Sequence, residues 1–469
     1  MAKATINYST SNPSIIRELM KDKFPLLPAK YPNKPTPIHI ANNFIAIAIG
    51  EGNLKIDLRN WIRNTESVDR FLKSSDEHIE KDSELLREIL RTIYDTDGNI
   101  FKSMGSPFPI TPSFIGRDPS DDGYANGLWL SLGKEKRESI HDLLLKFYSV
   151  LDESSSLGNL VSAFTEGDVY ASTTPIDLTS SSSIGANVAE IIVDALNSKL
   201  DQPIHIRLEI LRQLSTLLSA FVVIGMLFDA CAEERGLDKS SNPKDVLGTL
   251  IFTGEIGSRG TVEQRLNTLA VISLRDTVER AHLGILQHFK SMVADTRKVN
   301  PSQLWEDFCK SLSTKFLSTN SAQEFIKYLK HYGESNIESV VANMLPLTHL
   351  RTAIRSLGTK AGIVWPARRD QPRLALDANF LTSLVSFVGE ADMTVSDFVA
   401  RVNDKLGLIM GYSGVTEDQI LHLESLAGRK LEVRDLLVKA EKLLTNRLVS
   451  AGLARQFSDG SSSLLGGKI

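Results

Sequence analysis

The longest apolar run in the chain lies within residues 203–235 and predicts a helix that is buried on all sides. Between Leu214 and Phe228 nearly every position is apolar, and the apolar side chains cover the whole circumference of a helix rather than one stripe. Arg212 before the run and Asp229 after it keep it shorter than the about 20 apolar residues that a membrane-spanning helix needs. We therefore expect the core helix of a soluble protein, surrounded by other helices, and no membrane partner.

Apolar residues at helical spacing predict further helices on both sides of this core helix. The predicted ranges are 59–93, 135–151, 184–200, 261–294, 303–316, 322–332 and 337–345. The last four, together with the core helix, are expected to form one bundle. The chain is thus predicted to be mainly α, a multi-domain helical protein.

Two stretches interrupt the helical pattern. Ile45, Ile47 and Ile49 alternate with small alanines, which predicts a strand with a return strand over 54–58, although a short buried helix over 44–49 fits as well. Residues 104–133 are rich in proline and aromatic residues, which predicts an irregular region.

The last ninety or so residues carry a distinct order of elements. The pattern predicts helices over 379–388, 394–406, 416–426 and 433–450, a short strand over 408–410, and a final hairpin that turns at Asp459 and Gly460. The last helix ends in a leucine-rich "AGL" motif just before the first strand of that hairpin. This order resembles winged-helix domains, and the resemblance implies a C-terminal winged-helix-like domain, α with a small β-wing.

The length of 469 residues exceeds what one hydrophobic core usually serves, so several domains are expected. A serine-rich run over 179–183 marks one boundary, and the N-terminal arm is expected to pack along another domain or subunit. The predicted division is an extended arm (1–35), a mixed, mainly helical domain (36–180), a central helical bundle (184–348), a basic linker (349–374) and the winged-helix-like domain (375–469).

Charge is unevenly distributed along the chain. The net charge is −4, but residues 349–469 hold sixteen Lys and Arg against thirteen Asp and Glu. Six basic residues fall in or beside the linker with a single acid among them, and each is a candidate for a phosphate contact. They are Arg351, Arg355, Lys360, Arg368, Arg369 and Arg373. Pairing with the acidic first part of the chain is an equally good interpretation.

The winged-helix resemblance adds candidate nucleic-acid contacts, since a recognition helix of that family often enters the DNA major groove. On the last helix and the hairpin these are Lys439, Lys442, Arg447 and Arg455, with Arg434 at the start of the helix. Winged helices also bind proteins, and the acidic Glu432, Asp435 and Glu441 on the same helix favour a protein-binding role.

The sequence contains no common catalytic motif: no phosphate loop, GxGxxG, GxSxG, HExxH or CxxC. We therefore expect no catalytic residues, metal ligands or cofactors. Acidic residues over 76–80, and Glu51 with Lys55 and Asp57, leave a divergent metal-dependent nuclease as an alternative. Two cysteines and the absence of a secretory pattern predict a cytoplasmic protein.

Together these patterns predict a non-catalytic scaffold or adaptor subunit of a cytoplasmic complex, which binds a partner protein through its winged-helix module. The alternative is a DNA-binding subunit that recruits an ATPase or nuclease through the basic linker and the winged helix. The chain is also similar to helical accessory subunits of bacterial anti-phage defence systems, which implies an ATPase or nuclease as partner.

Overall fold

A computed structural model of the protein describes residues 20, 23–28, 35–49, 123–154, 182–253, 261–296, 345–365, 371–428 and 431–465. This part of the chain is mainly helical, as predicted, with a few short strands. The helices predicted over 59–93, 303–316 and 322–332, most of the one over 337–345, and the acidic residues near 51–57 and 76–80 lie outside the described residues.

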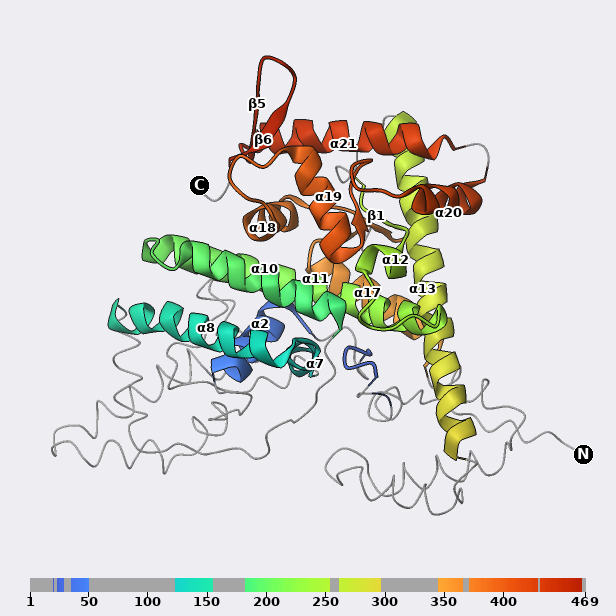
Figure 1. The fold of residues 1–469 in the computed structure, drawn as a ribbon, viewed down its shortest axis with the longest axis horizontal. Helices are drawn as coiled ribbons and strands as arrows, with labels where there is room; N and C mark the ends of the chain where they lie inside the picture. Colours follow the sequence, from blue (N-terminus) through green and yellow to red (C-terminus); the bar gives the residue numbers. More distant parts are fainter. Residues whose placement is uncertain are drawn as a thin grey trace, which may run out of the picture.

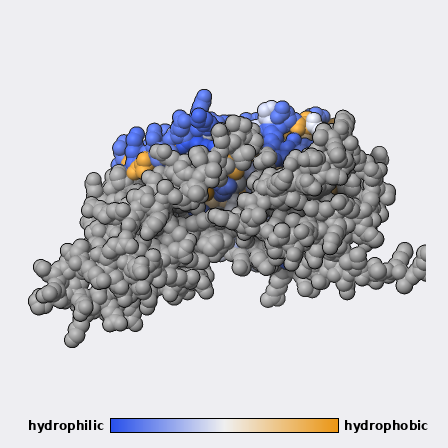
Figure 2. Space-filling model, turned by 90° about the horizontal axis from the view of Figure 1, so that it is seen from below, coloured by the Kyte–Doolittle hydropathy of each residue, from blue (hydrophilic) through white to orange (hydrophobic). Residues whose placement is uncertain are grey.

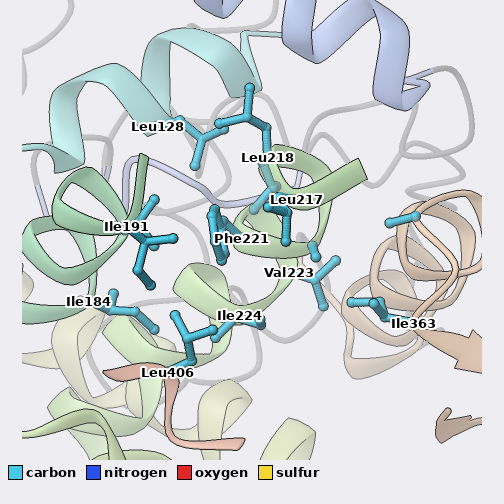
Figure 3. Packing of buried hydrophobic residues seen from close by; sticks show 14 of the residues in the cluster. Leu128, Ile184, Ile191, Leu217, Leu218, Phe221, Val223, Ile224, Ile363 and Leu406 are labelled. Atoms are coloured by element: carbon cyan, nitrogen blue, oxygen red, sulfur yellow. The ribbon is translucent and has the colours of Figure 1, made fainter. Parts of the chain in front are cut away.

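Helix α11 (Ile204–Glu234) confirms the predicted core helix. Phe221 is only 2% exposed, and nearly all of the surrounding turns are buried as well. Figure 3 shows Leu128, Ile191 and Ile363 from three neighbouring elements around this helix. Over the described residues α11 alone has the length and apolar composition of a membrane span, a test that buried core helices also pass, and 94% of its apolar window is buried inside the protein.

Two groups of helices cover α11 (Figure 1). On one side lie α2 (Pro37–Ile49), α7 (Tyr124–Ser131), α8 (Lys134–Ser154) and α10 (Ser183–Lys199). On the other side lie the long α13 (Thr261–Thr296) and α17 (Leu347–Lys360). Seen from below, the described residues that reach the surface are mostly hydrophilic, with hydrophobic ones in small spots (Figure 2).

The strand predicted over 45–49 is wrong and the alternative, a buried helix over 44–49, is confirmed, because this segment belongs to the helix α2; the return strand predicted over 54–58 lies outside the described residues. Ile40, Ala41, Phe44, Ile45 and Ala48 recur at helical spacing and are buried against α7, α8 and α11. A helix that is covered on several sides has no polar face, so its alternating Ile and Ala residues read equally well as a strand.

The irregular region predicted over 104–133 is also wrong in its last part, where α7 forms. The aromatic residues that suggested a loop are core residues of this helix: Tyr124 and Trp129 are buried, and the Trp129 ring meets Phe44 of α2 edge to face at 5.7 Å. Burial of the aromatic rings favours the helix here despite the glycines on either side.

The described part of the predicted N-terminal arm is buried in the chain's own core. Phe24, Leu26 and Leu27 are each at most 2% exposed. Gly127 of α7 and Gly225 of α11 make room for them, because a Cβ atom on Gly127 would lie 2.3 Å from the Pro25 carbonyl oxygen and one on Gly225 would lie 2.7 Å from Leu26.

The C-terminal elements form the layer drawn in orange and red in Figure 1. In order they are α18 (Ala378–Val388), α19 (Val395–Leu406), β4 (Leu408–Ile409), α20 (Glu417–Ala427), α21 (Val433–Ser450), β5 (Ala454–Gln456) and β6 (Ser462–Leu464). The predicted helices, the short strand and the hairpin are all present. The sequence offers Thr394 or Ser396 as the N-cap of α19, and the structure shows that Thr394 is the cap; Thr416 and Gln419 form a capping box on α20.

This layer is joined to the central helices by backbone pairing as well as by packing. Strand β1 (Leu250–Ile251), which follows α12 (Pro243–Leu247), pairs in parallel with β4, and Thr253 forms a bridge with Ala375. Phe252 stacks on Phe380 of α18 at 5.9 Å. Buried residues of both regions belong to one hydrophobic cluster, so among the described residues the core continues across the predicted boundary at 375.

Candidate nucleic-acid interface

Helix α21 lies along the outer edge of the C-terminal layer, and the β5–β6 hairpin projects beyond its end (Figure 1). The inner face of α21 is apolar and packs against α13, α19 and α20. The buried residues on this face are Val433, Leu436, Leu437, Ala440, Leu444 and Leu448. At its start, Arg434 donates to both carboxylate oxygens of Glu417, at 2.6 and 2.8 Å, and to the Tyr412 hydroxyl.

The outer face of α21 is a polar stripe. Its members lie three or four residues apart, which places them on one side of a helix. The stripe consists of Asp435, Lys439, Lys442, Asn446 and Ser450, all exposed. Within the described part of the chain, no hydrogen bond or ion pair holds the ammonium group of Lys439 or Lys442. Both ammonium groups are therefore available to an anionic ligand.

The acidic Glu441 on α21 is directed away from this stripe. Its carboxylate accepts hydrogen bonds from the Ser396 hydroxyl at 2.7 Å and from the Ser413 backbone N–H at 2.8 Å. Of the three acids that favoured a protein-binding role in the sequence, Glu441 is thus occupied within the chain, and Asp435 is the one on the stripe.

The hairpin adds a third exposed cation. The Arg455 guanidinium lies over the Phe457 ring, 5.8 Å from its centre, and both residues are exposed. In the turn, Asp459 accepts hydrogen bonds from the Ser461 hydroxyl and backbone N–H, which hold the pKa of Asp459 below its usual range. Gly460 has a φ of 84°, a conformation that glycine adopts without strain.

A short extended segment between α18 and α19 fixes the hairpin to the rest of the layer. Thr394 forms an antiparallel bridge with Ser463 of β6. The Leu464 N–H donates to the Met393 carbonyl at 2.8 Å, and the Asp392 N–H donates to the Leu464 carbonyl at 3.1 Å. The hairpin therefore has a third backbone partner and a fixed position relative to α21.

Two other predicted contacts, Arg447 and Arg373, take part in packing within the chain. Arg447 donates to the Leu376 carbonyl at 2.7 Å, beside Asp377, whose pKa is raised by burial. Arg373 is half-buried, which lowers its pKa, and its Nε finds no hydrogen-bond partner among the described residues.

The predicted basic linker contains a helix, α17, and its cations are spread over different contacts. Arg351 pairs with Glu279 of α13 at 2.7 Å, and Lys360 donates to the Pro35 carbonyl at 2.8 Å. Arg355 is half-buried, whereas Arg368 and Arg369 lie outside the described residues. The contact between Arg351 and Glu279 agrees with the interpretation that linker cations pair with the acidic first part of the chain.

Of the eleven predicted residues, the structure thus leaves Lys439 and Lys442 on α21 and Arg455 on the following hairpin exposed and without an ion pair among the described residues. Asn446 belongs to the same stripe but was not among the predicted contacts, because its side chain carries no charge. The signal that identifies it is its spacing, one heptad after Lys439.

In the described ranges no group of three or more His, Cys, Asp or Glu side chains is placed to hold a metal ion. No family model, curated protein or solved structure matches the chain.

Proposed function

We propose that the protein is a non-catalytic nucleic-acid-binding subunit that contacts duplex DNA through the stripe on α21 and the β5–β6 hairpin. The observation that carries this proposal is the stripe itself, in which two lysines have no ion pair or hydrogen bond among the described residues, together with the exposed Arg455 on the hairpin that follows α21. Lys and Arg neutralise phosphates, and Asn makes paired hydrogen bonds with adenine.

The order of elements supports a winged-helix-like arrangement for this layer. A helix (α18), a short segment (392–394), a second helix (α19), a last helix (α21) and a hairpin follow one another, and Thr394 of the segment forms a bridge with the second strand of the hairpin. In winged helices the last helix before the wing is the one that often reads DNA. Strand β4 and helix α20 are an insertion in that order.

The composition of the stripe favours nucleic acid over a protein partner. The centres of protein interfaces are depleted in Lys and enriched in aromatic residues, and the stripe has two Lys and no aromatic residue. In a cell, such a subunit would bring a catalytic partner, an ATPase or a nuclease, to the nucleic acid.

The salt dependence of duplex binding by the full-length protein tests the proposal. If Lys439, Lys442 and Arg455 each neutralise one phosphate, the log–log slope is about −2.7, so affinity falls roughly 40-fold between 50 and 200 mM salt. The double variant Lys439→Ala/Lys442→Ala should flatten the slope to about −0.9.

The matched control is Lys134→Ala/Lys136→Ala, which removes two exposed lysines from α8 and should leave the slope unchanged. The proposal fails if the wild type binds no duplex at low salt. It also fails if the α21 variant keeps the wild-type slope.

A protein-binding adaptor is the second candidate, and exposed apolar side chains near the same helix favour it. Leu421 on α20 is 59% exposed and Val438 on α21 is 51% exposed. If a partner protein docks there, Leu421→Ser/Val438→Ser should abolish co-purification of that partner, whereas Lys439→Ala/Lys442→Ala should leave it intact.

A further inference from the structure

Five titratable side chains from four segments meet beside the N-terminal segment 23–28. They are Lys23 of that segment, Asp229 and Glu233 of α11, Lys239 of the following loop and His288 of α13. Lys23 Nζ lies 2.7 Å from Glu233 Oε2, and His288 Nδ1 lies 3.2 Å from Glu233 Oε1. Lys239 Nζ donates a hydrogen bond to the Lys23 backbone carbonyl. Glu233 and Lys239 thus both hold the segment at Lys23.

Apolar contacts follow directly along the same segment. The Phe24 ring meets the His288 ring edge to face at 5.2 Å, while Leu26 and Leu27 are buried in the core. Gly127 and Gly225 leave the space that these residues fill. The segment therefore lies in a site that is ionic at one end and apolar at the other.

Asp229 differs from the other four groups because nothing in the described structure satisfies it fully. It is 2% exposed, and its Oδ1 has no hydrogen-bond partner. Burial raises the pKa of Asp229 to about 6, although the charges of Lys239 and Lys23 oppose this change. An ionised carboxylate that is buried without hydrogen bonds is costly, and admitting water would relieve that cost.

We propose that residues 23–28 form a detachable strap, which Lys23 fastens to α11 and which loosens when Asp229 is ionised. The ionic contacts to the strap converge on Lys23, and local opening would in addition expose Phe24, Leu26 and Leu27 while the rest of the core stays folded. Opening would let water reach Asp229. Hydration stabilises the ionised carboxylate strongly and the protonated carboxyl only weakly, so ionisation favours the open state.

The neighbouring groups set the pH range of this effect. Burial lowers the pKa of His288 although Glu233 opposes it, so His288 is mainly neutral at pH 7 to 8. Burial would raise the pKa of Glu233, but Lys23 and His288 outweigh it and hold this pKa below its usual range. Asp229 therefore changes its charge near pH 6, whereas the pKa of His288 lies below its usual value.

Hydrogen exchange of the full-length protein, followed by mass spectrometry and corrected for intrinsic rates, tests the strap. Lys23→Ala should speed exchange in residues 23–28 and leave the helices α10 and α18 unchanged. The exposed Lys136→Ala is the control and should change neither. If Lys23→Ala leaves exchange of 23–28 unaltered, or speeds exchange equally in α10 and α18, the segment is not a separate strap.

The effect of Asp229 ionisation on strap opening is measured by comparing the wild type with Asp229→Asn. Both proteins contain His288, so any pH dependence that His288 causes cancels in the comparison. We expect the ratio of the corrected exchange rates of residues 23–28, wild type over variant, to rise about tenfold from pH 5 to pH 8. This value assumes that the pKa of Asp229 returns to its ordinary value when the strap opens. A ratio that does not change with pH overturns the coupling.

Discussion

At the scale of single residues, Asp229 is a carboxylate buried at a cost in free energy. Its pKa is raised from 3.8 to about 6, so the folded state binds more protons than the unfolded state between these values. The free energy of unfolding therefore decreases as the pH rises through this window, and the cost is fully present above pH 6. We predict that Asp229→Asn stabilises the protein at pH 8 by about 2–3 kcal/mol, measured by chemical denaturation.

The gain from Asp229→Asn should shrink as the pH falls toward 4, because the wild-type carboxyl is then protonated as well. Asp142→Asn, at an exposed position of α8, is the control and should have little effect at either pH. Equal or lower stability of Asp229→Asn at pH 8 would show that Asp229 is satisfied in a way that its surroundings do not reveal.

Which side chains of α21 face solvent could be predicted from the sequence, but not what the others contact. Helical spacing alone places Lys439 and Lys442 on the outer face. Arg447 lies at the edge of that face, and its guanidinium turns inward because the Leu376 carbonyl, 71 residues earlier in the chain, is within 2.7 Å. Contacts of this kind depend on the tertiary fold and have no local signal.

At the scale of elements, the crossing of α11 and α13 depends on a close approach at Gly284. A Cβ atom on Gly284 would lie 1.9 Å from the Ala230 carbonyl oxygen. Ala normally favours a helix over Gly by about 1 kcal/mol, so the substitution would be favourable without the neighbour. We predict that Gly284→Ala instead lowers the free energy of unfolding by about 1–3 kcal/mol, because the two helices must move apart.

Leu283→Ala is the matched control for this prediction, since Leu283 is the preceding residue of α13 and is 49% exposed. Thermal melting of both variants decides the question. Unchanged or raised stability of Gly284→Ala would mean that the helices are not in contact at this point.

Helices with a clear apolar stripe or a capping residue were predictable, and those without one were not. Thr394 caps α19, and both that cap and the helix can be read from the sequence. Helices α2 and α7 lack a polar face because they are packed among α8, α10 and α11, so the pattern left helix and strand open for the end of α2 and did not indicate α7.

At the scale of the whole molecule, the C-terminal layer depends on the central helices for much of its support. Lys405 pairs with Glu190 of α10 at 2.6 Å, and Lys244 of α12 pairs with Asp404 at 2.9 Å. These contacts, the pairing of β1 with β4 and the packing of α18 on α11 join residues that are far apart in the chain. The division at 375 rested on a local pattern of elements, which contains no information about such distant partners.

We therefore predict that a fragment of residues 371–469 does not fold alone, because it would expose the faces of α18, α19 and β4 that α10, α11 and β1 cover. Its circular dichroism should show little cooperative melting, and it should aggregate on gel filtration. The control is the full-length protein with a protease site between Trp365 and Gln371, whose two pieces should stay together after cleavage. A fragment that melts cooperatively with native-like helix content would instead establish an independent C-terminal domain. The hydrophobic core that continues across residue 375 would then be an interface between two domains.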